Sequence, residues 1–160
     1  MTPDDQIMTR RLAGGDVQSL RDLNALFAAV FEDPATYTKQ PPDAAYLADL
    51  LASSQFIAVS AETEAALVGG LIAYVLPKFE QRRSEIYIYD LAVRAGHRRQ
   101  GVATQMIAAV QDIAAAIGAW VVFVQADYVD PPAIALYEKL GAREEVLHFD
   151  IPPTKTSSFL

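Results

Sequence analysis

The chain has 160 residues, of which 52% are hydrophobic, enough for one globular core and too many for a largely disordered protein. Thirteen Lys and Arg against twenty Asp and Glu give a formal charge of −7, which disfavours nucleic acid and favours cationic partners, although acidity also simply keeps proteins soluble. Cysteine is absent, which excludes disulfides and thiolate chemistry, and neither a membrane-length apolar run nor a basic leader is present, so we expect a cytoplasmic protein.

The N-terminal third predicts one short strand followed by two helices. Ile7–Leu12 has strand character, Gly14–Gly15 breaks it, and Asp16 is placed to cap the first helix. The apolar face of that helix consists of Leu20, Leu23, Phe27, Val30 and Phe31.

Residues 32–42 are expected to be a loop, because three prolines in this stretch discourage a helix. Asp43 can cap the second helix, which is short. Its apolar residues are Tyr46, Leu47, Leu50 and Leu51.

Three β-rich runs follow. Phe56–Ala61 and Ala66–Val75 are joined through the polar Glu62–Glu64, a composition typical of an antiparallel hairpin. Glu85–Val93 is the third run.

A long amphipathic helix is predicted from Gly101 to Ile117, ended by Gly118. Trp120–Gln125 should be a buried strand, so the strand, helix and strand around Gly101 imply a parallel crossover. The apolar residues of the helix are Val102, Met106, Ile107, Val110, Ile113 and Ile117.

The C-terminal part predicts a helix beginning at Pro131 and a last strand over Ala142–Ile151. Residues 152–160 are expected to be a loose tail, and its Phe159 and Leu160 could dock on a partner subunit.

The junction His97–Thr104, between the third β-run and the long helix, indicates a pyrophosphate site. Amides in the first turn of a helix lack intrahelical partners, and the helix dipole adds partial positive charge there. Gly101 removes an obstructing Cβ, while Arg98 and Arg99 can add charge-assisted bonds. His97 fits a loop residue better than a metal ligand, and no residue spacing suggests a metal site.

The segment Arg98–Ala103 resembles the R/Q-x-x-G-x-G/A signature of the GCN5-related N-acetyltransferases, in which this loop grips acetyl-CoA. Tyr89–Val93 resembles the strand that binds pantetheine in that family, and Ala133–Ala142 resembles its A-x-x-x-Y-x-x-x-G segment. The similarity covers roughly residues 56–150.

This resemblance implies a single α/β (α+β) N-acetyltransferase domain over residues 1–160, with a coenzyme-binding core at about 85–142. The implied fold is a mixed central sheet of about six strands flanked by about four helices, with a β-bulge near Asp90. It also implies acetyl-CoA as the acetyl donor, no metal, and a homodimer.

The coenzyme residues implied by the resemblance lie on the third β-run, in the junction, and before the last helix. Asp130 stands where many family members carry asparagine, which leaves it available for a cation. The full set is Leu91, Ala92, Val93, Arg98, Arg99, Gln100, Gly101, Val102, Ala103, Thr104 and Asp130.

Two residues are the candidate catalytic groups. Asp90 follows an apolar and aromatic strand and could attract the substrate ammonium and accept its proton, or it could simply end the strand. Tyr137 falls where the family places a tyrosine that protonates the coenzyme thiolate, although it also lies in an apolar helical stripe. His148 is an alternative general base.

Four longer strings resemble the gentamicin-type aminoglycoside 3-N-acetyltransferases: Leu76–Gln81, Ser84–Val93, Val124–Tyr128 and Val146–Ile151. The implied reaction is direct transfer of acetyl from acetyl-CoA to the 3-amino group of a cationic aminoglycoside, which confers antibiotic resistance. Carboxylates would hold the ammonium groups. The candidates are Glu80, Asp90, Asp127, Asp130, Glu144, Glu145 and Asp150.

Two other functions fit the same residues. The acceptor could be a polyamine or a protein amine, or the chain could be a coenzyme-binding sensor without an acceptor. A nucleic-acid module is remote, because no basic aromatic surface is evident.

Overall fold

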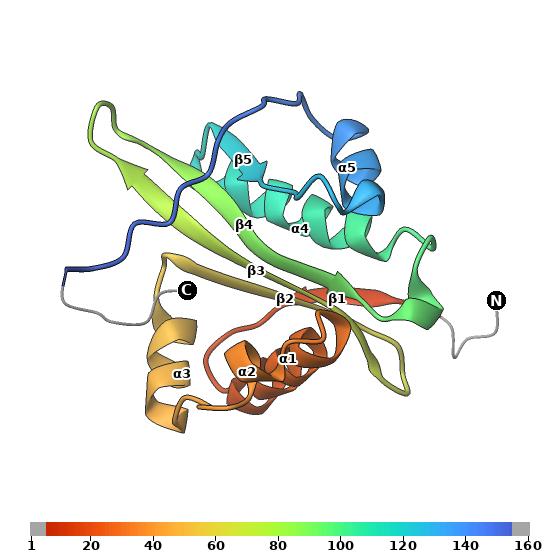
Figure 1. Ribbon diagram of the computed structural model, residues 1–160. Helices are drawn as coiled ribbons and strands as arrows, with labels where there is room; N and C mark the ends of the chain where they lie inside the picture. The colour runs from red at the N-terminus through yellow and green to blue at the C-terminus, as the bar shows by residue number, and fades with distance from the viewer. Residues whose placement is uncertain (1–5, 155–160) are drawn as a thin grey trace. The chain divides into compact units, whose positions relative to one another are not determined.

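The computed structural model describes residues 6–154 (Figure 1). Within them the chain forms two compact units that divide after Gln125, and each is described by itself. The first unit is a twisted sheet with helices on both faces, as expected for an α/β acetyltransferase fold.

The five strands of the sheet follow one another in the order of the sequence. All neighbours are antiparallel except the last pair, which is parallel, so the predicted crossover is confirmed. The strands are β1 (Met8–Arg11), β2 (Phe56–Glu62), β3 (Leu67–Lys78), β4 (Arg83–Val93) and β5 (Val121–Val124).

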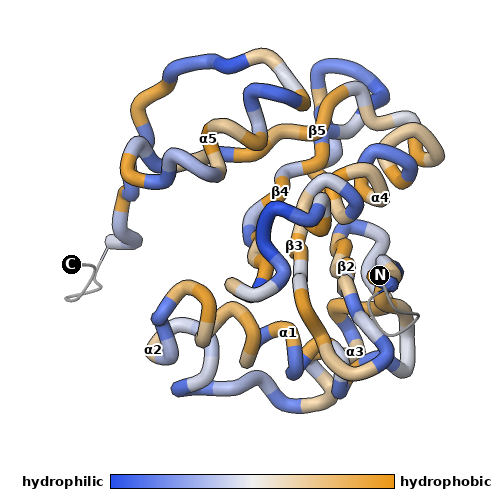
Figure 2. Tube along the Cα trace, turned by 90° about the vertical axis from the view of Figure 1, so that its right-hand side faces the viewer, coloured by the Kyte–Doolittle hydropathy of each residue, from blue (hydrophilic) through white to orange (hydrophobic). Residues whose placement is uncertain are grey.

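Helices α1 (Val17–Val30), α2 (Pro34–Tyr37) and α3 (Ala44–Ala52) lie on one face of the sheet, and α4 (Val102–Ile117) lies on the other (Figure 1). The hydrophobic residues concentrate on the central strands, most visibly β2 and β3 (Figure 2). Two consecutive glycines of β3 allow the close approach of helices from both sides.

Each of these two glycines faces a different helix. A Cβ on Gly69 would meet Met106 and Val102 of α4 at 3.1 and 3.2 Å. A Cβ on Gly70 would come within 2.6 Å of Leu23 in α1. The pair therefore sets how closely both helices pack where β3 runs beside the end of β4.

The loop expected over residues 32–42 contains the short helix α2, so that prediction is wrong in part. Proline is well tolerated in the first turn of a helix, and the Asp33 side chain accepts a hydrogen bond from the Thr36 amide. Asp43 caps α3 through the Tyr46 amide, as predicted.

Asp16 flanks α1 but its side chain does not cap the helix, contrary to the prediction. Its carboxylate instead accepts hydrogen bonds from the Ala13 amide at 2.8 Å and from Arg10 at 3.0 Å. Strand β5 is half-buried rather than buried, because it forms the edge of the sheet.

The second unit contains α5 (Pro131–Glu138), with Asp130 accepting a hydrogen bond from the Ala133 amide. The strand expected over Ala142–Ile151 is absent from the described residues. Apolar and polar residues alternate from Leu147 to Ile151, but a strand also needs a backbone partner, and Leu147 is 84% exposed. Phe159 and Leu160 lie outside the described residues.

Replacing Gly70 with alanine should destabilise the protein by about 1–3 kcal/mol, because the added methyl overlaps Leu23 and presses on Phe27 at 3.3 Å. Urea unfolding followed by circular dichroism measures this. The matched control is Gly14→Ala, where no atom lies within 4 Å and the change should stay within about 0.5 kcal/mol. Equal effects at both positions would contradict the packing described.

Candidate active site

Strand β4 carries a bulge directly before Asp90. Asp90 pairs with Ile72 of β3, whereas Ala73, the next β3 residue, pairs with Ile88. Tyr89 is therefore the extra residue, and the bulge expected near Asp90 is confirmed.

The ladder between β4 and β5 ends at the same place. Glu85–Ile88 pairs with Val121–Val124, and β5 offers no partner beyond Val124. The remaining residues of β4, Tyr89–Val93, have no strand partner on that side of the described sheet, although the Val93 carbonyl accepts a hydrogen bond from Arg98 Nε at 3.2 Å. An extended ligand with amide groups can hydrogen bond to such an edge. Leu91, Ala92 and Val93, expected to bind the coenzyme, lie on it.

The start of α4 lacks a side-chain cap. Its flanking residue is Gly101, with φ of 79°, and no side chain caps the first turn. By contrast, aspartates cap α2, α3 and α5. The amides of Val102, Ala103 and Thr104 therefore remain available to an anion, and open space surrounds the position of a Cβ on Gly101.

The loop before α4 is held by its own hydrogen bonds. Arg99 has a left-handed backbone with φ of 61°, which is uncommon for a residue other than glycine. Gln100 donates a side-chain hydrogen bond to the Gly96 carbonyl at 3.2 Å. Arg99 and Gln100, expected as coenzyme contacts, therefore also shape this turn.

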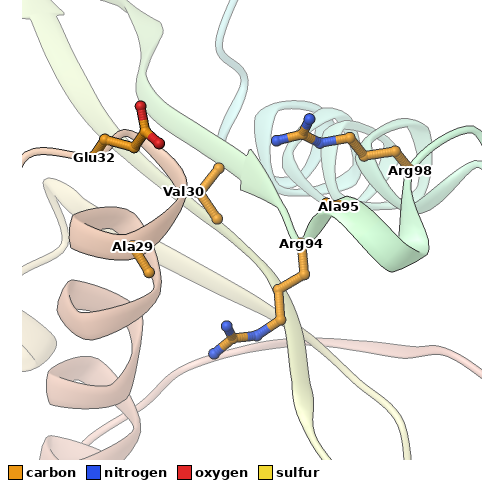
Figure 3. A pocket seen from close by; sticks show the side chains of 6 residues that line it. All are labelled: Ala29, Val30, Glu32, Arg94, Ala95 and Arg98. Carbon is orange, nitrogen blue, oxygen red and sulfur yellow. The ribbon is translucent and has the colours of Figure 1, made fainter.

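A pocket of about 310 Å³ lies between the end of α1 and the turn after β4 (Figure 3). Arg94 and Arg98 each donate from Nε to a backbone carbonyl, of Leu67 at 2.8 Å and Val93 at 3.2 Å. Within the described residues, their terminal guanidinium nitrogens have no hydrogen-bond partner and suit phosphate oxygens. The pocket is lined by Ala29, Val30, Glu32, Arg94, Ala95 and Arg98.

Asp90 is a half-buried carboxylate with one strong partner. The hydroxyl of Tyr37 donates to its Oδ1 at 2.5 Å. Burial raises the pKa of Asp90 above the ordinary aspartate value, and the hydrogen bond from Tyr37 opposes that rise. Burial, followed by the neighbouring carboxylate, raises the pKa of Tyr37, so its hydroxyl stays protonated and donates.

Tyr37 is a residue that the sequence analysis missed. Its ring packs against Phe27 and Phe31 at centroid distances of 5.6 and 5.7 Å, which docks α2 on the end of α1. The only available signal was Asp33 before Pro34, a typical helix start, inside a segment expected to be a loop.

The structure does not bring Glu80 together with Asp90. Glu80 pairs with Arg83 at 3.2 Å in the turn before β4. Asp90 lies seven positions after Arg83 along the same extended strand, roughly 23 Å away at about 3.3 Å per residue.

The other predicted acidic residues and Tyr137 belong to the second unit, so their roles at the site stay predictions. His148 and Asp150 pair at 2.9 Å, and Glu145 pairs with Arg143 at 2.8 Å. Asp130 caps α5, while Asp127 and Glu144 are exposed. Burial, then the Asp130 charge, raises the pKa of Tyr137.

Two further findings concern the described residues only. No cluster of three or more His, Asp or Glu side chains there could hold a metal ion. None of their helices has both the length and the apolar character needed to cross a membrane.

Comparison with known proteins agrees with this architecture. The chain belongs to the acetyltransferase (GNAT) family, whose model matches residues 20–142. A search of curated proteins found no match.

Among solved structures, the aminoglycoside acetyltransferase HMB0005, from an uncultured soil metagenomic sample, is 52% identical with a TM-score of 0.90. The alignment covers 93% of this chain and 99% of that one. The aminoglycoside acetyltransferase meta-AAC0020, also from an uncultured soil metagenomic sample, is similar in complexes with trehalose and with sisomicin. These show 36% and 35% identity, each with a TM-score of 0.85 and coverage of 94% and 99%. The chain is thus a GNAT acetyltransferase with aminoglycoside acetyltransferases as structural neighbours.

With Asp90 as the predicted general base, replacing Tyr37 with phenylalanine should move the acidic limb of the kcat/KM profile to higher pH. The lost hydrogen bond favours the ionised carboxylate, so the pKa of Asp90 rises further when the hydroxyl is removed. Acetyl transfer measured from about pH 5 to 9 tests this.

The control for that profile is Tyr46→Phe, because Tyr46 is an exposed tyrosine of the neighbouring α3 that does not hydrogen bond to Asp90. Its profile should match the wild type. An acidic limb that stays in place in Tyr37→Phe would show that Tyr37 does not control Asp90.

Proposed function

We propose that this protein is an acetyl-CoA-dependent N-acetyltransferase that acts on the 3-amino group of a gentamicin-type aminoglycoside. Strands β4 and β5 separate at the bulge, and the half-buried carboxylate of Asp90 lies beside this opening, where a thioester and an amine could meet. The names of the neighbours at 52% and 35–36% identity, and the sisomicin bound to one of them, support an aminoglycoside acceptor. Antibiotic resistance would be the biological result.

The residues around the loop before α4 fit acetyl-CoA. Uncapped amides of Val102, Ala103 and Thr104, together with Arg98, would hold the pyrophosphate, and a side chain at Gly101 would intrude on that space. The open edge at Leu91–Val93 would hold the pantetheine arm by hydrogen bonds to its amides. When bound, acetyl-CoA supplies the activated acetyl thioester.

Asp90 would act on the acceptor amine. Ionised, it attracts the ammonium group, and its carboxylate oxygens accept a proton from the nitrogen directly or through one water. The raised pKa brings Asp90 closer to the operating pH, which makes it a better base than an exposed aspartate. The hydrogen bond from Tyr37 fixes the orientation of the carboxylate.

Tyr137 is the proposed proton donor to the departing thiolate. Its hydroxyl carries a proton at neutral pH, because an ordinary tyrosine pKa is already about 10 and burial raises the pKa of Tyr137 further. Asp127, Asp130, Glu144, Glu145 and Asp150 are proposed to attract the remaining ammonium groups of a polycationic acceptor. We also propose that the protein is cytoplasmic and that it forms a homodimer. Light scattering of the purified protein would test the dimer.

The substitution Asp90→Asn distinguishes a catalytic role of this carboxylate from a structural role. The pKa of Asp90 is higher in the folded protein than in the unfolded chain, so the folded state binds this proton more tightly. The free energy of unfolding therefore falls as the pH rises through the folded pKa and Asp90 becomes charged. At neutral pH the substitution should therefore raise the melting temperature while lowering kcat about 100-fold or more. Coenzyme affinity should stay unchanged.

The assay follows release of coenzyme thiol from acetyl-CoA with gentamicin, spermidine or a lysine peptide, and NMR of the product identifies the acetylated nitrogen. We expect amine-dependent release with gentamicin and acetylation at the 3-amino group. Faster turnover of spermidine or of the peptide than of gentamicin would show that the acceptor is a polyamine or a protein amine. Coenzyme binding without thiol release for any of the amines would identify a coenzyme-binding sensor. Full activity in Asp90→Asn would make Asp90 structural.

A further inference from the structure

Four aromatic rings form a continuous row across three neighbouring strands. Tyr74 on β3 contacts Tyr89 on β4 at a centroid distance of 5.9 Å, and Tyr89 contacts Tyr87 at 5.5 Å. Tyr87 then stacks on Phe123 of β5 at 4.7 Å with an interplanar angle of 6°. These four residues are called the aromatic row.

The aromatic row lies on the sheet face that carries α1–α3. Tyr74 contacts Phe56 at 5.9 Å, and Phe56 belongs to the buried cluster that includes Leu47 of α3. Ile86 and Ile88, which flank Tyr87 in β4, are buried. The bulge places Tyr89 next to Asp90, so the row begins at the proposed catalytic carboxylate.

The row is more open to solvent than packing alone would require. Tyr89 is 62% exposed and Tyr74 is 38% exposed. The Tyr87 hydroxyl donates to the Gln125 side chain at 2.7 Å, which fixes that ring beside Phe123. Cross-strand ring pairs do stabilise sheets, but that role needs no carboxylate at the end of the row.

The charge of Asp90 reaches these rings. Burial raises the pKa values of Tyr74 and Tyr87, and the Asp90 carboxylate adds to both shifts, as do neighbouring tyrosines. A half-buried anion beside electron-rich ring faces favours a cation over a neutral or anionic ligand. The C–H faces of a sugar ring can pack on the same rings, because they are apolar.

We propose that the aromatic row is an acceptor subsite that binds the amino-sugar rings beyond the one being acetylated, while Asp90 holds the reacting ammonium. This subsite rests on the proposed function and is the surface that would select the acceptor. The ring centroids of Tyr89 and Tyr87 lie 5.5 Å apart, and those of Tyr87 and Phe123 lie 4.7 Å apart. The row is therefore long enough to contact more than one sugar ring. A large aminoglycoside would use it, whereas a single-ring amine would not.

Tyr89→Leu tests the subsite because Tyr89 is exposed and its replacement should leave the fold intact. For gentamicin, KM and the calorimetric dissociation constant should rise about three- to tenfold with kcat nearly unchanged. For 2-deoxystreptamine, a single-ring diamine, both values should stay as in wild type. Tyr89→Phe, which keeps the ring, should restore gentamicin binding.

Phe123→Leu, from a different strand, should show the same selective loss for gentamicin. The matched control is Phe79→Leu, a fully exposed aromatic residue in the turn before β4, which should change neither acceptor. Three results would overturn the subsite. They are an unchanged KM for gentamicin in Tyr89→Leu and Phe123→Leu, an equal loss of affinity for both acceptors, and a lower melting temperature with no change in binding. Failure of the wild type to acetylate gentamicin would instead overturn the proposed function, and the subsite with it.

Discussion

Strands β4 and β5 part after Ile88, and every other feature of the site follows from that separation. One extra residue, Tyr89, disturbs β4 at the point where the parallel ladder stops, and the backbone beyond it keeps an open edge. The chain then runs directly from that edge into the turn before α4, whose first amides lack a side-chain cap. Only residues 94–101 separate this strand edge from the helix N-terminus, and we propose that one ligand spans both.

The same bulge also organises the side of β4 on which we propose that the acceptor binds. Asp90 and Tyr89 are adjacent at the bulge, and the carboxylate is held by Tyr37 from a helix of only four residues. Burying this carboxylate costs stability, as its raised pKa shows. Local choices that reduce stability are typical of functional sites, and Arg99, with its left-handed backbone, is a second case in the adjoining turn.

Features that depend on local sequence were predictable. Asp43 and Gly118 mark helix ends by short-range hydrogen bonding and backbone conformation, and both were identified correctly. The junction at residues 97–104 was predicted to bind a pyrophosphate because glycine and arginine at the start of a helix suit phosphate oxygens, and that role stays a prediction. The bulge was expected only through the family resemblance, since no residue pattern specifies which strand gains the extra residue.

Features that depend on tertiary contacts were missed or predicted wrongly. Ala142–Ile151 was predicted to be a strand, and Leu147–Ile151 does alternate apolar and polar residues, but pairing depends on a partner that the segment itself does not specify. Tyr37 reaches Asp90 across 53 positions of sequence, and the aromatic row joins three strands. Neither arrangement is visible until the register of the sheet is known.

The open β4 edge and the first turn of α4 are proposed to bind one coenzyme molecule. Backbone amide NMR during titration with coenzyme A measures this directly. The largest shifts should fall on Leu91–Val93 and on Val102–Thr104, saturating together with a single dissociation constant. Shifts confined to other parts of the chain, or two separate affinities for the two segments, would contradict the account.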